Sequence, residues 1–141
     1  MDIITANTDE LYEQCLDIRF KVFVDEQKVP ENEEVDQFEK ECTHFLVKID
    51  DEYVGTARFR AKSENTVKIE RVAVHSTYRG RGIGFKLMEH MHEVAKINGY
   101  TYAVLGAQVH AVKFYESLGY EIDSDIFLDA GIEHYMMKKS L

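Results

Sequence analysis

The chain has 141 residues, 45% of them apolar, and a formal net charge of −9. This length suits one domain with a substantial core, so we expect a single domain over residues 1–141. An acidic chain disfavours nucleic acid and anionic membranes as partners, because both bind through basic patches. We find no signal peptide and no apolar run of membrane-spanning length, which is typical of a cytoplasmic protein.

The first part of the chain predicts a strand, a helix and an acidic segment. Residues 1–5 favour a short strand, and apolar residues then recur at helical spacing behind Thr8 as the N-cap. The helical stripe consists of Leu11, Cys15, Ile18 and Val22. Residues 25–41 hold eight acids and two lysines. We interpret this segment as a solvated loop or short helix, with an acidic rim that attracts amines as the functional alternative.

The middle of the chain predicts three consecutive antiparallel strands, because residues 44–49, 53–61 and 66–74 are rich in β-branched and aromatic residues. A glycine-rich turn then leads into an amphipathic helix that starts at Ile83. The apolar face of this helix carries Leu87, Met91, Val94 and Ala95, and the helix stops at Asn98 and Gly99.

The last part of the chain predicts a buried strand, a helix and a hairpin. The expected ranges are 101–105 for the strand, 109–118 for the helix, and 120–128 and 133–138 for the hairpin strands. Gly119 is expected to cap the helix. The order of elements predicts the α/β class, a mixed sheet with helices on both faces.

The turn between the third strand and the long helix reads Tyr78-Arg79-Gly80-Arg81-Gly82-Ile83-Gly84. A glycine-rich turn at a helix N-terminus presents backbone N–H groups to an anion, and two guanidiniums lie beside it. The dinucleotide pattern G-x-G-x-x-G fails because Phe85 stands where its third glycine is needed. The Walker A pattern is also absent. The loop therefore predicts a different phosphate ester.

The spacing of Arg79, Gly82 and Gly84 fits R/Q-x-x-G-x-G/A, which resembles the pyrophosphate loop of the GNAT N-acetyltransferase superfamily. Residues 108–120 resemble the family segment N-x-x-A-x-x-F-Y-E-x-L-G-F, with Gln108 in place of the usual Asn. Residues 19–27 followed by His44 resemble a small bacterial subgroup of poorly defined substrate.

The resemblance implies a mainly antiparallel central sheet and transfer of an acetyl group from acetyl-CoA to a primary amine or a peptide amine. In the family, the strand before the loop follows the pantetheine arm and its amides polarise the thioester carbonyl. The implied coenzyme A contacts are Val72, Ala73, Val74, Arg79, Gly80, Arg81, Gly82, Ile83, Gly84, Gln108 and Phe114. Phe114 has core packing as its alternative role. Tyr115 matches the family's general acid, with a core tyrosine as the alternative.

The general base is open. Glu70 shares strand parity with Val72 and Val74, so we expect its carboxylate on their side of the sheet, where related enzymes often carry an acid. A structural ion pair with a nearby cation is an equal alternative. His110 and His75 also titrate near neutrality, and a dedicated base is not required.

Other functions and acceptors were weighed on the same residues. A catalytically silent acyl-CoA sensor would lack Tyr115, and a nucleotide-binding module would need a base-recognition motif that is absent. Arg58 and Arg60 lie on one face of a strand and could bind an anionic acceptor such as an amino-sugar phosphate. Cys42 near His44 lacks the third group of a nucleophilic site, and the histidines show no zinc spacing. A homodimer is an open prediction.

Overall fold

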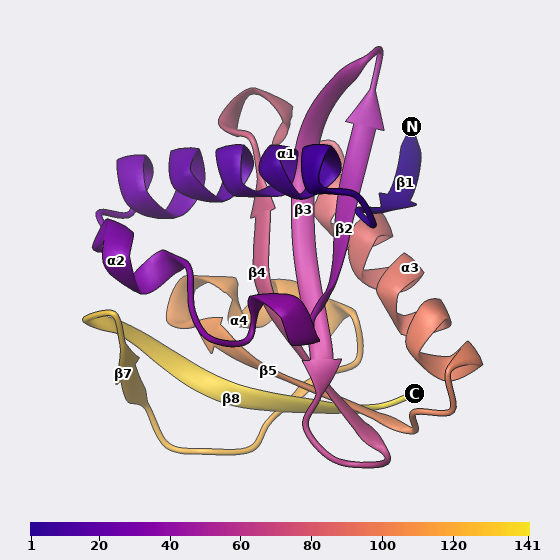
Figure 1. The fold of residues 1–141 in the computed structure, drawn as a ribbon. Helices are drawn as coiled ribbons and strands as arrows, with labels where there is room; N and C mark the ends of the chain where they lie inside the picture. The colour runs from indigo at the N-terminus through magenta and orange to yellow at the C-terminus, as the bar shows by residue number, and fades with distance from the viewer.

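The computed structural model describes residues 1–141 and contains an eight-stranded mixed sheet with helices on both faces (Figure 1). The strand order is β1-β2-β3-β4-β5-β8-β6, and β7 also pairs with β8. Only β4 and β5 are parallel neighbours. The strands are β1 (Asp2–Thr5), β2 (Thr43–Ile49), β3 (Glu52–Ala61), β4 (Thr66–Val74), β5 (Tyr102–Gln108), β6 (Glu121–Ile122), β7 (Phe127–Asp129) and β8 (Ile132–Ser140). The predicted fold class is confirmed.

The helices form a layer on each side of this sheet. They are α1 (Asp9–Arg19), α2 (Glu31–Glu34), α3 (Ile83–Ile97) and α4 (Val112–Ser117), with a π-helix at Phe20–Glu26 and 3₁₀ turns at Glu39–Glu41, Ser76–Tyr78 and Val109–Ala111. In Figure 1, α1 and α2 lie in front of the sheet, and α3 and α4 lie behind it. Both predicted forms of the acidic segment are present, since α2 is a short helix between irregular stretches.

The α1 helix begins where the sequence predicts. The Thr8 hydroxyl accepts a hydrogen bond from the Leu11 N–H at 3.2 Å, which satisfies one of the free donors of the first turn. Cys15 and Ile18 are buried against the sheet. The helix then widens into the π-helix, where the Gln27 N–H donates to the Val22 carbonyl, five residues back, at 3.2 Å. The predicted stripe therefore continues across two kinds of helix.

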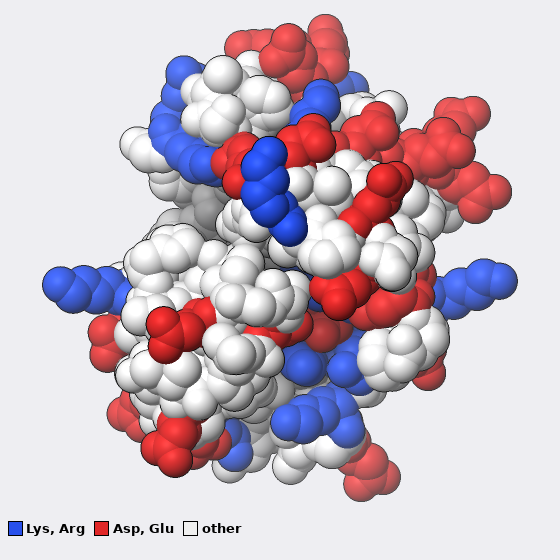
Figure 2. All heavy atoms as spheres, turned by 90° about the vertical axis from the view of Figure 1, so that its left-hand side faces the viewer, with Lys and Arg blue, Asp and Glu red and all other residues white.

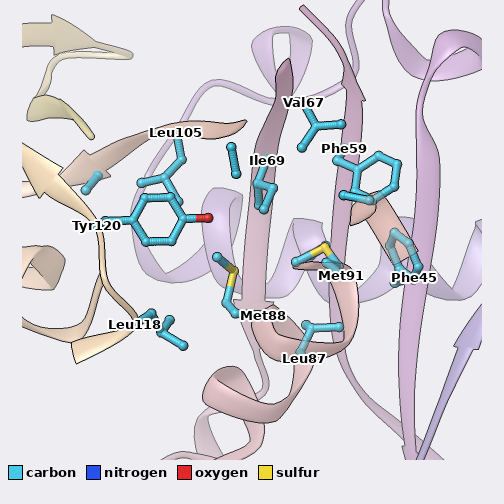
Figure 3. Packing of buried hydrophobic residues seen from close by; sticks show 14 of the residues in the cluster. Phe45, Phe59, Val67, Ile69, Leu87, Met88, Met91, Leu105, Leu118 and Tyr120 are labelled. Atoms are coloured by element: carbon cyan, nitrogen blue, oxygen red, sulfur yellow. The ribbon is translucent and has the colours of Figure 1, made fainter. Parts of the chain in front are cut away.

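The main hydrophobic core lies between the sheet and α3 (Figure 3). Leu87 and Met91 are fully buried there, as predicted, and Val94 is half-buried at its edge. The labelled core residues are Phe45, Phe59, Val67, Ile69, Leu87, Met88, Met91, Leu105, Leu118 and Tyr120. Each large apolar side chain buried in this way contributes about 1.5–3 kcal/mol, so the core fixes α3 and the loop before it on the sheet.

The C-terminal elements differ from the prediction in their limits. β5 continues to Gln108, three residues beyond the expected end, because it pairs with β8 along its whole length. The expected helix over 109–118 begins as a 3₁₀ turn, and its α-helical part is shorter. The expected strand over 120–128 is divided into β6 and β7. The Met136 N–H donates to the Ser124 hydroxyl at 2.9 Å, so a side chain replaces the strand partner at the break.

Candidate active site

The glycine-rich loop brings the backbone to the N-terminus of α3 in conformations that require glycine. Gly80 and Gly82 have φ angles of 78° and 77°, in the left-handed region. Gly82 is the N-cap of α3, where no side chain caps the helix and no acid lies in the first turn. Ile83 buries its side chain in the core. The first N–H groups of α3 and the positive end of its dipole are therefore free to bind an anion.

The two arginines of this loop have different contacts. Arg79 donates from Nε to the Val74 carbonyl at 2.9 Å, and its terminal nitrogens pair with Glu26 at 2.9 and 3.0 Å. The Arg81 guanidinium lies over the Tyr78 ring, with Cζ 5.0 Å from the ring centroid. An anion at the loop can approach Arg81 directly, but it competes with the Glu26 carboxylate for Arg79.

β4 and β5 separate beside this loop. Only residues 66–68 of β4 pair with residues 102–104 of β5, and the two strands then diverge (Figure 1). On the β5 side, the later residues of β4 have no strand partner. Val72 and Val74 pack toward α3, whereas Ala73 is buried toward α1. The predicted pantetheine contacts thus lie along an open strand edge, which offers backbone groups to a ligand.

A β-bulge in β4 overturns the predicted orientation of Glu70. Arg58 pairs with Glu70, and Thr56 pairs with Ala73, so two residues of β4 face one residue of β3. Arg71, within the bulge, has a φ of 58°. One extra residue moves the following side chains to the other face of the sheet. The prediction that Glu70 lies on the same side as Val72 and Val74 is therefore wrong.

Three cationic side chains surround Glu70 on the α1 side of the sheet. Its Oε1 accepts from Arg58 at 3.2 Å and from Arg60 at 3.1 Å, and Lys68 Nζ lies 3.6 Å from Oε2. This geometry favours the structural ion pair that the sequence left open. The predicted role of Glu70 as a general base stays a prediction.

Most of the buried charge on the α1 side belongs to what we call the arginine network: Arg19, Arg58, Glu34, Asp36 and Glu39. Arg19 pairs with Glu34 at 2.8 Å, and Arg58 pairs with Asp36 at 2.7 Å and Glu39 at 2.6 Å. Burial alone would favour neutral acids, but hydrogen bonds from Arg19 hold the pKa of Glu39 well below its usual value. Hydrogen bonds from Arg58 likewise lower the pKa of Asp36 against its burial.

The network corrects two predictions. The acidic segment is not a solvated loop at Glu34, which is 2% exposed, and Asp36 and Glu39 are held by arginines. Arg58 is 0% exposed, so it cannot bind an anionic acceptor. Alternating charged positions on a strand indicate a shared face, but they do not reveal whether that face is covered.

A cavity of about 710 Å³ lies between the acidic segment and the β7–β8 hairpin, at the place where β4 and β5 diverge. It brings together several of the residues that the sequence singled out: Glu70, Val72, Gln108, His110 and Tyr115. The glycine-rich loop, Ala73, Val74 and Phe114 do not line it. The predicted site residues therefore divide between an anion-binding loop and a separate cavity.

Tyr115 extends from α4 to the wall of this cavity. Its ring centroid lies 5.0 Å from that of Phe114 and 5.9 Å from that of Tyr120, both in edge contacts. Burial raises the pKa of Tyr115 to about 12, so its phenol carries a proton at neutral pH. The hydroxyl has no hydrogen-bond partner within the protein. Phe114 packs beside Gly84, where an added Cβ would lie 3.4 Å from its ring.

Gln108 ends β5 at the edge of the cavity. Its Nε2 donates to the Gln27 Oε1 at 2.7 Å, which ties β5 to the residue that ends the π-helix. The predicted contact with coenzyme A at this position stays a prediction, since the amide already has a partner. His110 is exposed on the cavity wall, and His75 instead caps the 3₁₀ turn before the loop.

His134 lines the cavity although the sequence gave no reason to select it. Its Nδ1 lies 2.7 Å from the Ile132 carbonyl, which only accepts hydrogen bonds, so Nδ1 carries the proton and Nε2 has a free lone pair. The ring stacks on Phe127 with centroids 5.7 Å apart. His134 stands opposite Gln108 in the β5–β8 ladder. Knowledge of that register would have identified it.

The remaining candidate residues show no second site. Burial raises the pKa of the Cys42 thiol to about 11, which disfavours the thiolate that a nucleophile needs. No group of three or more His, Cys, Asp or Glu side chains is arranged to hold a metal ion. None of the helices is long and apolar enough to cross a bilayer.

Comparison with known proteins connects this geometry to a family. The family model described as the acetyltransferase (GNAT) domain matches residues 7–141. The chain is 37% identical over 140 residues to the uncharacterized N-acetyltransferase YjcF of Bacillus subtilis, and the match covers 99% of both chains.

Two solved structures have the same fold. An acyl-CoA N-acyltransferase from Pseudomonas aeruginosa superposes with a TM-score of 0.87 at 29% identity, covering 98% of each chain. A GNAT family acetyltransferase from Elizabethkingia anophelis, with acetyl-CoA bound, superposes with a TM-score of 0.75 at 19% identity, covering 99% of this chain and 97% of that one. The chain belongs to the GNAT family of N-acetyltransferases.

Proposed function

We propose that this protein transfers an acetyl group from acetyl-CoA to a small primary amine. The observation that carries the proposal is the divergence of β4 and β5. The uncapped N-terminus of α3 follows the end of β4, and the cavity adjoins the same diverging strands. An elongated phosphate ester could bind with its phosphates at the loop and its reactive end at the cavity.

The loop supplies what a pyrophosphate requires. The N–H groups of Gly82 and Gly84 and the guanidinium of Arg81 would donate charge-assisted hydrogen bonds to its oxygens. The free edge of β4 at Val72 and Val74 would hold the pantetheine arm and donate an N–H to the thioester oxygen as negative charge develops on it.

The chemical step forms a bond between the amine nitrogen and the acetyl carbonyl carbon, and it breaks the carbon–sulfur bond. Tyr115 would donate its phenolic proton to the departing thiolate. A phenol whose pKa is raised to about 12 holds this proton until the sulfur leaves. The cavity beside Tyr115 would hold the acceptor amine.

The amine attacks only as the free base, so a group at the cavity should accept its proton. The lone pair on His134 Nε2 suits this role better than Glu70, whose carboxylate is engaged by Arg58, Arg60 and Lys68. The open cavity and Tyr115 favour turnover over a silent acyl-CoA sensor. A cytoplasmic location and a homodimer stay predictions.

Turnover tests the proposal directly. Purified protein with acetyl-CoA and a mixed amine pool should release coenzyme A and give products heavier by one acetyl group. Tyr115→Phe should lower turnover about 100-fold, the lower end for a general acid, because a thiolate of pKa near 8.5 leaves fairly well unaided. Tyr53→Phe, on a half-buried tyrosine outside the cavity, is the matched control. Wild-type turnover in Tyr115→Phe, where chemistry limits the rate, would exclude the catalytic role.

A further inference from the structure

The cavity is lined by more charge than the mechanism uses. Four carboxylates lie on or behind its α1-side wall, and arginines hold each of them: Glu34, Asp36, Glu39 and Glu70. These acids have their charge balanced inside the protein. They are therefore poor partners for a cationic acceptor, although the whole chain carries a net charge of −9.

The cations on the same wall retain free donors. Arg60 uses Nε for Glu70 at 3.1 Å and stacks on Phe38 with Cζ 3.9 Å from the ring centroid. Its two terminal nitrogens have no partner within the protein, and its side chain is 19% exposed in the cavity. Lys68 stands beside Arg60 in the β3–β4 ladder and has only the 3.6 Å contact with Glu70. Phe38 thus holds a guanidinium in place with its fork unoccupied.

Arg71 adds a third cation on this wall. It pairs with Glu34 at 3.0 Å and Asp36 at 3.4 Å, and its Nη1 has no partner within the protein. Its left-handed φ of 58° is strained for a residue with a side chain, and such strain concentrates at functional positions. The bulge therefore holds a guanidinium at the cavity wall next to Val72, the predicted thioester contact.

We propose that Arg60, Lys68 and Arg71 form an anion subsite, and that the acceptor is an amine that also carries a carboxylate or a phosphate. The inference rests on the proposed acetyltransferase function. Four residues of strand separate Lys68 from Val72, about 13 Å, so the subsite suits an acceptor whose anionic group lies several bonds from its amine. Figure 2 shows basic side chains close below acidic ones on the face of the molecule formed by the left side of Figure 1.

Matched acceptors test this subsite without a known substrate. We would compare 4-aminobutyrate and 6-aminohexanoate with their carboxamides, and phosphoethanolamine with ethanolamine, and include spermidine as a polycation. The anionic member of at least one pair should have the higher kcat/KM. Comparing the carboxylates with the phosphate ester identifies which anion is bound.

The variant Arg60→Met keeps the apolar stem and removes the charge. It should lower kcat/KM for the preferred anionic acceptor roughly 10- to 100-fold and leave its neutral partner unchanged, because it removes a charge-assisted hydrogen bond. Lys62→Met removes an exposed charge outside the cavity and is the control. Thermal unfolding and acetyl-CoA affinity verify the fold. If Arg60→Met does not fold, Lys68→Met tests the same wall.

The outcomes separate the two proposals. Turnover of neutral or cationic amines only, or equal turnover of both members of each pair in wild type and Arg60→Met, overturns the anion subsite but leaves the acetyltransferase function standing. A loss that is the same for charged and neutral acceptors assigns Arg60 to the fold alone and also overturns it. Failure to transfer acetyl to any amine overturns both proposals.

Discussion

The arginine network and the glycine-rich loop both place guanidiniums near carboxylates or free backbone groups, but they treat charge in opposite ways. In the network, Arg19 and Arg58 are at most 1% exposed and carboxylates hold them from several sides. In the loop, the donors at the start of α3 have no partner, and Arg81 is exposed.

This difference separates structural charge from ligand-binding charge. A buried ion pair is costly unless its hydrogen bonds are complete, and the network comes close to that condition, with Arg58 Nε as the single buried polar side-chain atom that lacks a partner. The loop leaves its donors unpaired at the surface, where water satisfies them until an anion replaces it. Unspent donors, rather than the number of charges, mark where a ligand binds.

Breaking the network should give the largest effect. Arg58→Met leaves Asp36, Glu39 and Glu70 without a shared partner, and we expect a loss of about 3–5 kcal/mol in the free energy of unfolding, measured by urea titration. The matched loop variant Arg81→Met should change it by no more than about 0.5 kcal/mol. Equal small losses in the two variants would contradict the comparison.

Breaking the loop should reverse the pattern. Arg81→Ala should weaken coenzyme A binding by about 1.5–3 kcal/mol in calorimetry while the stability stays near that of the wild type. Lys86→Ala removes an exposed charge one helical turn away and serves as the control. An affinity that is lowered equally by both variants would indicate general attraction by positive charge instead of a specific contact.

Acid should act on the buried charges and leave the loop alone. Burial, and then the charge of Lys139, lower the pKa of His92 to about 4, so the unfolded chain takes up a proton that the folded chain refuses. Stability should therefore fall as the pH drops from about 6.5 to 4, by at most about 1.4 kcal/mol per pH unit from this group. Below about pH 4, Asp36 and Glu39 add a loss of the same sign, since their lowered pKa values favour folding only while they are ionised.

Urea unfolding at pH 7, 5 and 3.5 would measure this dependence. Arg58→Met should flatten the part below pH 4 and preserve the part above it. A flat profile between pH 7 and 5 in the wild type would show that His92 does not remain neutral in the folded protein.

The smallest expected effect joins the two regions. Glu26→Gln frees Arg79 from its exposed ion pair, so coenzyme A affinity should rise, by less than about 1 kcal/mol. Glu31→Gln removes an exposed acid that does not contact Arg79 and should change nothing. A fall in affinity in Glu26→Gln would mean that Glu26 positions Arg79 for the ligand.

Local patterns were sufficient for most of the fold. Apolar residues at helical spacing predicted α1 and α3, and the glycines at positions 82 and 119 lie at the helix ends where they were expected. These signals succeed because each depends on neighbours within a few residues. The loop was recognised for the same reason, since its anion-binding chemistry lies in one short stretch of backbone.

The parts that were missed depend on distant residues. The orientation of Glu70 depends on a bulge that pairing with β3 creates, and the burial of Arg58 depends on a segment that folds over it from 19 to 22 positions earlier in the chain. His134 reaches the cavity through its register with β5. No periodicity within a single strand records such pairings.

The π-helix has a consequence for how the length of this chain can vary. Its wider turn accommodates an additional residue between α1 and Gln27, and this places Glu26 against Arg79 and Gln27 against Gln108. Deleting one residue between positions 20 and 26 would restore an ordinary α-helix and rotate everything after it by about 100°. Both contacts would then be lost together, so this segment tolerates changes in side chain far better than changes in length.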